Sequence, residues 1–154
     1  MESGRKILPD SNPAKTNAMA DPAAQRLTTL RNGLLRLHKH LLDLERAAYE
    51  RDVARIQGPG HLLDLLLNDP WFAWLRELSQ FVVLVDETLD LDEPATAADA
   101  DRLIGEARRL ISPGENADGF ARRYREAMQR DAGAVLAHRD MMNVFAALGS
   151  KHGD

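Results

Sequence analysis

The longest regular pattern in this chain is a row of apolar residues whose spacing alternates between three and four. The row consists of Leu27, Leu30, Leu34, Leu37, Leu41, Leu44 and Ala48. A second row beside it consists of Leu35, Leu42, Tyr49 and Ile56. Because an α-helix has about 3.6 residues per turn, this spacing places both rows on one broad face of a single helix. We therefore predict a helix from Ala23 to Ile56. Asp21 is its expected N-cap, and Pro22 is expected at its first position.

Helix-breaking residues divide the rest of the chain. Gly58, Pro59 and Gly60 end the first helix, and Thr96 with Asp99 forms a capping-box signal. The run FVVLV at 81–85 resembles a strand, but it lies inside a longer helical pattern, so we assign it to a helix. The remaining helices are expected at 61–67, 70–89, 97–111, 117–130 and 134–148.

The length of 154 residues suits one domain. We expect an all-α fold, an antiparallel bundle of four main helices plus one short helix, over residues 23–149. Residues 1–22 combine three prolines with mostly polar residues, so we expect a disordered tail there. A short disordered C-terminus is expected at 150–154.

Composition excludes several classes of function. The chain has no cysteine, which rules out thiolate metal sites, cysteine nucleophiles and a disulfide scaffold. With 20 basic and 24 acidic residues, it has no overall positive charge to attract nucleic acid or an anionic membrane. No apolar run approaches the roughly 20 residues that span a bilayer, and no signal peptide is visible. We therefore expect a cytoplasmic protein without membrane contact.

Three ionisable residues, His38, Glu45 and Asp52, recur every seven positions between the two apolar rows. Polar groups in such a place need partners. Residues seven apart are separated by about 10.5 Å along a helix, so the three cannot form one site. Glu45 is flanked by leucines and needs a nearby cation, which an Arg or His from a facing helix would supply.

A possible partner lies on the last helix, where His138 falls among apolar residues and should face the core. There it could approach His38, Glu45 or Asp86. A hydrogen bond from His138 to Glu45 or Asp86 is the interpretation that we favour. The alternative is an iron, manganese or zinc ion held by His138 and Glu45, although the Glu-x-x-His pairs of ferritin-like di-iron centres are absent. We predict no cofactor.

Two further segments are candidates for contact with partners. Trp71 and Trp74 are expected to anchor the core, which leaves Phe72 as the exposed aromatic residue. Arg122, Arg123 and Arg125 could touch phosphates, but they equally suit a solvated helix face.

The segments HLLDLLLNDPWFAWLRELS at 61–79, GFARRYREAMQRD at 119–131 and AVLAH at 134–138 resemble those of a group of small bacterial proteins of unassigned function. The resemblance implies a bacterial helical domain and no particular activity, cofactor or catalytic residue. Hemerythrin-like bundles share the expected architecture, but their pattern of metal-ligating histidines is not matched here.

These observations favour a non-enzymatic interaction or regulatory module that binds another protein through an exposed helix face or through Phe72. Ser79 has no glycine-rich elbow or oxyanion donor beside it, so no acyl-transfer enzyme is indicated. A bundle that holds a metal or small ligand is the alternative. A weaker alternative is a nucleic-acid-associated protein. Self-association is also possible.

Overall fold

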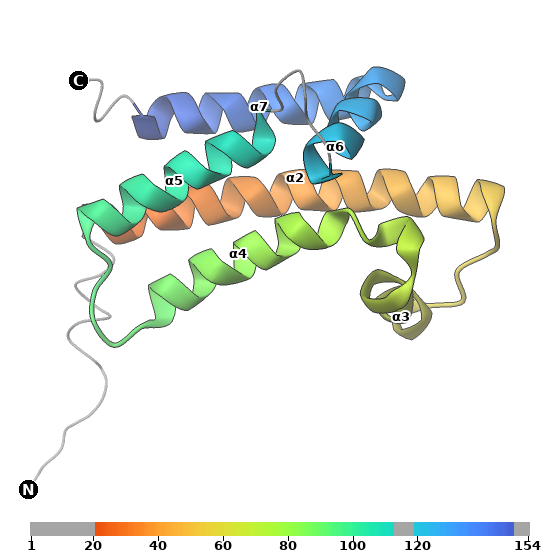
Figure 1. The fold of residues 1–154 in the computed structure, drawn as a ribbon, viewed down its shortest axis with the longest axis horizontal. Helices are drawn as coiled ribbons and strands as arrows, with labels where there is room; N and C mark the ends of the chain where they lie inside the picture. The colour runs from red at the N-terminus through yellow and green to blue at the C-terminus, as the bar shows by residue number, and fades with distance from the viewer. Residues whose placement is uncertain (1–20, 113–118, 150–154) are drawn as a thin grey trace, which may run out of the picture.

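The computed structural model describes residues 21–112 and 119–149. Over these ranges the chain folds into α-helices and one short 3-10 helix, with no strand (Figure 1). The elements are α2 (Pro22–Asp52), α3 (Pro59–Asn68), η1 (Pro70–Phe72), α4 (Leu75–Asp90), α5 (Ala97–Ile111), α6 (Gly119–Arg130) and α7 (Ala132–Gly149). The predicted all-α class is confirmed, and residues 81–85 are helical. The tails expected at 1–22 and 150–154 lie outside the described residues, apart from residues 21 and 22.

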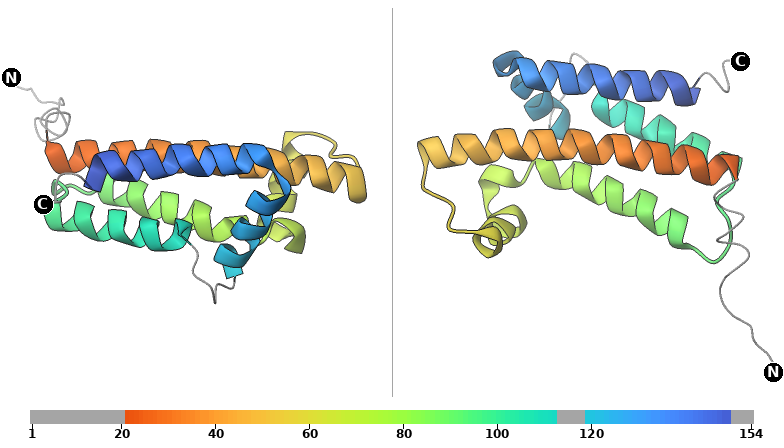
Figure 2. Two further views of the ribbon diagram at one scale, coloured as in Figure 1. Left: turned by 90° about the horizontal axis from the view of Figure 1, so that it is seen from above. Right: turned by 180° about the vertical axis from the view of Figure 1, so that it is seen from behind.

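The four long helices α2, α4, α5 and α7 alternate in direction along the chain (Figures 1 and 2). The longest, α2, is central and packs against α7, α4 and α5. Leu27, Leu30 and Leu34 of its leucine row are fully buried in the core. The helix expected at 117–130 is α6, a short helix that runs steeply across the others (Figure 2).

The start of α2 matches the prediction, whereas its end does not. The Asp21 side chain accepts a hydrogen bond from the Ala23 amide, and Pro22 is the first helical residue. The helix ends at Asp52, four positions before the predicted Ile56. Ile56 is nevertheless buried, because its amide donates a 3.0 Å hydrogen bond to the Glu50 side chain and the non-helical chain places it against the core.

The helix predicted at 70–89 is interrupted at its start. Pro70–Phe72 forms a 3-10 turn whose first free amide, that of Trp71, donates to the Asp69 side chain at 2.8 Å. The continuous α-helix begins only at Leu75. Arg76 donates to the carbonyl groups of Leu66 and Asp69, which closes the end of α3 against α4.

Two local features hold the long helices in place. The expected capping box opens α5, since the Asp99 amide donates to Thr96 and the Thr96 amide donates to Asp99. These hydrogen bonds lower the pKa of Asp99. Gly33 lets α2 approach α7 closely, because a Cβ atom at this position would lie 3.1 Å from Met141 Sδ. None of the described helices combines the length and the apolar character that a membrane crossing requires.

Candidate functional site

The buried carboxylate Glu45 pairs with an arginine. Its side chain is only 2% exposed, and its Oε2 accepts a 2.5 Å hydrogen bond from Arg130 Nη2. Arg130 is the last residue of α6, so the pair ties α2 to the end of that helix. The expected hydrogen bond from His138 to Glu45 is wrong, whereas the arginine that we considered as an alternative cation is present.

His138 instead pairs with a residue of α6. Its Nδ1 lies 2.7 Å from the hydroxyl of Tyr124, a fully buried residue. Burial raises the pKa of Tyr124 and lowers the pKa of His138. At neutral pH the tyrosine is therefore protonated and the imidazole neutral, so the hydroxyl donates to Nδ1. This is a structural contact between two helices that are adjacent in the sequence.

The other two core candidates lie elsewhere. Asp86 forms an ion pair with Arg31 of α2. His38 is half-buried, which lowers its pKa, and no hydrogen bond or ion pair joins it to another described residue. Over residues 21–112 and 119–149, no group of three or more potential ligands could hold a metal ion. The four candidates thus occupy separate positions and do not form one site.

The aromatic residues after α3 are buried differently from our expectation. Phe72 is fully buried and packs against Tyr49 at a ring distance of 5.6 Å, so the prediction that it is exposed is wrong. Trp71 is half-buried at the edge of Tyr49, and Trp74 is buried against Phe120, as expected for core anchors. The prediction assumed one continuous α-helix from residue 70, whereas Phe72 lies in a 3-10 turn with a different number of residues per turn.

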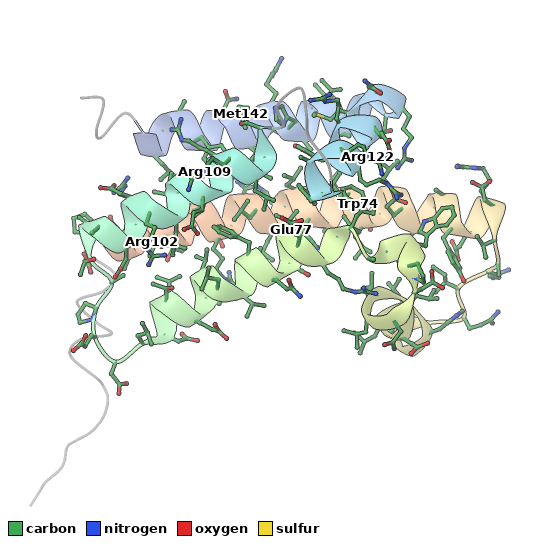
Figure 3. The ribbon with its side chains drawn as sticks, viewed as in Figure 1. Trp74, Glu77, Arg102, Arg109, Arg122 and Met142 are labelled. Carbon is green, nitrogen blue, oxygen red and sulfur yellow. The ribbon has the colours of Figure 1, made fainter. Side chains whose placement is uncertain are left out.

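Arg122 and Arg123 of α6 contact side chains of the protein itself. Arg122 and Arg123 both lie within 4 Å of Glu126, and Arg123 also covers the Trp74 ring at 5.9 Å. Figure 3 labels Arg122 on α6 and Trp74 below it. Arg125 is half-buried. These contacts are those of a solvated helix face, and nucleic-acid binding stays an untested hypothesis.

A shallow groove of about 200 Å³ runs between α2 and α7. Its polar lining includes Arg36, His40 and Asp140. His40 Nε2 lies 3.2 Å from Asp131 Oδ2, which also accepts a hydrogen bond from the Ala134 amide in the first turn of α7. The last helix was predicted to start at Ala134, but α7 begins two residues earlier, at Ala132.

A surface feature that the sequence analysis missed lies on α4. Val83 is 50% exposed, Leu84 is 39% exposed, and Leu91, which follows the helix directly, is 60% exposed. Val82 and Val85 of the same run are buried. A signal for this was present, because five consecutive apolar residues in a helix must occupy more than one face. We call Val83, Leu84 and Leu91 the outer row of α4.

Comparison with family models, with curated proteins and with solved structures finds no match to this chain.

Proposed function

We propose that this protein is a non-enzymatic interaction module that binds another protein through the outer face of α4. The observation that carries the proposal is the outer row, in which apolar side chains face solvent although α4 already buries a complete apolar face against α2. We further propose that it acts in the bacterial cytoplasm, a compartment in which a chain without cysteines loses nothing to reducing conditions.

The outer row has the spacing of a helix-docking surface. Val83 and Leu84 are adjacent, and Leu91 follows them by two helical turns, so all three lie along one side of α4. Exposed apolar residues that share one side of a helix are more characteristic of interaction sites than isolated ones. Val135 and Leu136 of α7 are a similarly exposed pair, but Met142, two turns after Val135, is partly buried, so the exposed apolar residues do not continue along α7 as they do along α4.

The short helix α3 adds support from the same side of α2, opposite α7 (Figures 1 and 2). Five of its ten residues are leucine, but only Leu65 is buried. Leu63 and Leu67, four positions apart, are more than half exposed. The chain thus has unused apolar surface on this side in two neighbouring elements.

The polar core residues also favour binding over chemistry. Glu45 is held by Arg130, His138 by Tyr124 and Asp86 by Arg31. Each pair joins two helices, which is a structural task. Three of the four titratable core candidates are therefore explained by contacts between helices.

The test is site-specific photo-crosslinking in the native cell. A benzophenone amino acid replaces Glu87, which lies one turn from Val83 and one turn from Leu91 on the exposed side of α4. We expect an adduct of discrete mass that disappears when Val83→Glu and Leu84→Glu are added. The captured protein, once purified, should bind the wild-type chain and not this double variant.

The matched control places the same amino acid at Arg139 on α7 and combines it with Val135→Glu and Leu136→Glu. These positions form an equally exposed Val-Leu pair on another helix. The proposal fails if position 87 gives no adduct, or if both positions capture the same proteins with no effect of the α4 substitutions.

A further inference from the structure

The segment that carries the outer row contains charges of one sign only. From residue 77 to residue 101 the chain contains no Lys, Arg or His, although 20 of its 154 residues are Lys or Arg. The same segment holds eight carboxylates, those of Glu77, Asp86, Glu87, Asp90, Asp92, Glu93, Asp99 and Asp101. It comprises nearly all of α4, the loop after it and the start of α5, so every charge that this segment itself contributes is negative.

Part of this charge is already compensated within the fold. Asp86 pairs with Arg31, Asp101 with Arg26, and Asp99 with Arg102 at the start of α5. Glu77 is labelled on α4, and Arg102 on α5, in Figure 3.

Other carboxylates lack a cation. Glu77, Glu87, Asp92 and Glu93 form no ion pair with any residue in the described ranges. Glu87 lies between the two ends of the outer row, one turn after Val83 and one turn before Leu91. Asp92 and Glu93 directly follow Leu91. Carboxylates without cations therefore border the exposed apolar side chains.

We propose that the partner presents a basic amphipathic helix to the outer face of α4, with apolar residues against the outer row and Lys or Arg residues against the flanking carboxylates. This inference depends on the proposed function. The row from Val83 to Leu91 extends about 12 Å along the axis of α4, a length over which a second helix can pack alongside. Apolar anchors within a charged border are the usual design of helix recognition, and the charges add specificity and a faster encounter.

The same charges disfavour other occupants. Anionic lipid surfaces and nucleic acids are repelled by a border of carboxylates. A second copy in a two-fold symmetric dimer would bring Glu87 and its neighbours opposite their own counterparts, which is unfavourable. A basic helix is the partner that satisfies both the apolar and the acidic part of the surface.

The experiment uses two fluorescein-labelled synthetic peptides of three identical heptads, with Leu at positions a and d. One peptide carries Lys at the exposed positions, and the other carries Glu. Binding to the full chain is followed by fluorescence anisotropy. We expect the Lys peptide to bind at least about tenfold more tightly than the Glu peptide, and to weaken as salt is raised, because screening reduces the attraction between exposed charges.

Three variants identify the surface. Val83→Glu with Leu84→Glu should weaken the Lys peptide about tenfold or more, whereas the matched Val135→Glu with Leu136→Glu should change its affinity by less than about twofold. Glu87→Gln with Asp92→Asn and Glu93→Gln removes charge without touching the apolar row. This triple variant should weaken the Lys peptide and leave the Glu peptide unchanged or tighter. Circular dichroism confirms the fold of each variant.

The outcomes separate the inference from the proposed function. If both peptides bind equally and depend on Val83 and Leu84, the basic partner is wrong and the docking face stands. If neither peptide binds while the crosslink at position 87 persists, the inference fails and the proposed function does not. Binding that ignores the α4 substitutions overturns the inference. So does a dimer in sedimentation that Val83→Glu with Leu84→Glu converts to monomer, because a second copy then occupies the face.

Discussion

Glu45 and Arg130 form a pair whose two members differ in their access to water. The carboxylate is 2% exposed, whereas the guanidinium side chain is 42% exposed. Removal of one partner from a buried ion pair leaves an uncompensated charge, and the cost depends on where that charge lies. Loss of the arginine leaves an unpaired negative charge in the core. Loss of the carboxylate leaves an unpaired positive charge near solvent.

We therefore expect Arg130→Met to lower the free energy of unfolding by about 2–4 kcal/mol at neutral pH, and Glu45→Gln by about 1–2 kcal/mol. Urea denaturation measures both. Arg122→Met, at a largely exposed position, is the control and should change stability by less than about 0.5 kcal/mol. Equal losses from the two core variants would contradict the asymmetry.

The contact of His138 with Tyr124 predicts a pH dependence with a definite sign. Burial lowers the pKa of His138, so the unfolded chain binds more protons than the folded one below the ordinary histidine value of 6.5. Stability should consequently fall as pH drops below 6.5, and stop falling below the folded pKa. His38 has the same sign.

Denaturation between about pH 5 and 8 should show a smaller loss on acidification for His138→Gln than for the wild type. Tyr124→Phe removes the donor to Nδ1 and should cost about 1 kcal/mol at neutral pH. An unchanged pH profile in His138→Gln would mean that His138 titrates alike in the folded and unfolded states.

The sequence was informative about which of these residues are buried and less so about their partners. Glu45 lies between leucine rows, which predicted a buried carboxylate in need of a cation. Arg130 is 85 positions away on a helix whose crossing direction no local pattern specifies. His138 was expected to reach across the bundle, but its partner is 14 positions back on the preceding helix.

The starts of α2 and α5 were predicted well because their capping signals are local. The cap at Asp21 and the capping box at Thr96 each involve residues two or three apart. Helix ends and interruptions were harder to predict, because the side chains of Glu50 and Asp69 accept hydrogen bonds from backbone amides and the chain changes direction there. The apolar pattern continues through such turns, since Ile56 and Phe72 are buried although neither lies in an α-helix.

Two helical glycines allow a test of the close packing between α2 and α7. At Gly105 of α5 the nearest atom to an added Cβ is Arg109 Nη1 at 3.8 Å, whereas at Gly33 it is Met141 Sδ at 3.1 Å. Gly105→Ala should stabilise the protein by about 0.5–1 kcal/mol through helix propensity. Gly33→Ala should stabilise the protein less than Gly105→Ala does, because the Met141 side chain must move to make room for the methyl group.

A larger side chain at Gly33 should force the two helices apart. We expect Gly33→Leu to cost about 1–3 kcal/mol, the usual range for overpacking. Thermal or urea denaturation measures this series. A stabilisation of Gly33→Ala equal to that of Gly105→Ala would show that α2 and α7 tolerate the extra methyl group without strain.

At the scale of the whole molecule, local stability should follow the packing of each helix. The middle of α2 is covered by three long helices, whereas α3 buries one residue and packs mainly on η1. Amide exchange followed by mass spectrometry should therefore show the slowest exchange around residues 30–41 and faster exchange in α3 than in the four long helices. Uniform protection across α3 and α2 would mean that the whole chain opens only as one unit.

The bundle class could be predicted because leucine spacing and helix-breaking turns agreed along the chain. The direction of α6 and the second apolar face of α4 could not be predicted. Both depend on which side of each helix is covered by the neighbouring helices. Val83 and Val85 are the same residue type two positions apart, yet one is half exposed and the other fully buried.

The central position of α2 has a consequence for how the chain is made. Two of the helices that cover α2 come late in the sequence, and α7 begins about 80 residues after α2 ends. At a synthesis rate of about 5–20 residues per second, the ribosome needs roughly 4–16 s to add the residues between the end of α2 and the start of α7. During that interval part of the leucine surface of the nascent chain has no native partner. Sequestration by a ribosome-associated chaperone during these seconds would protect it from aggregation.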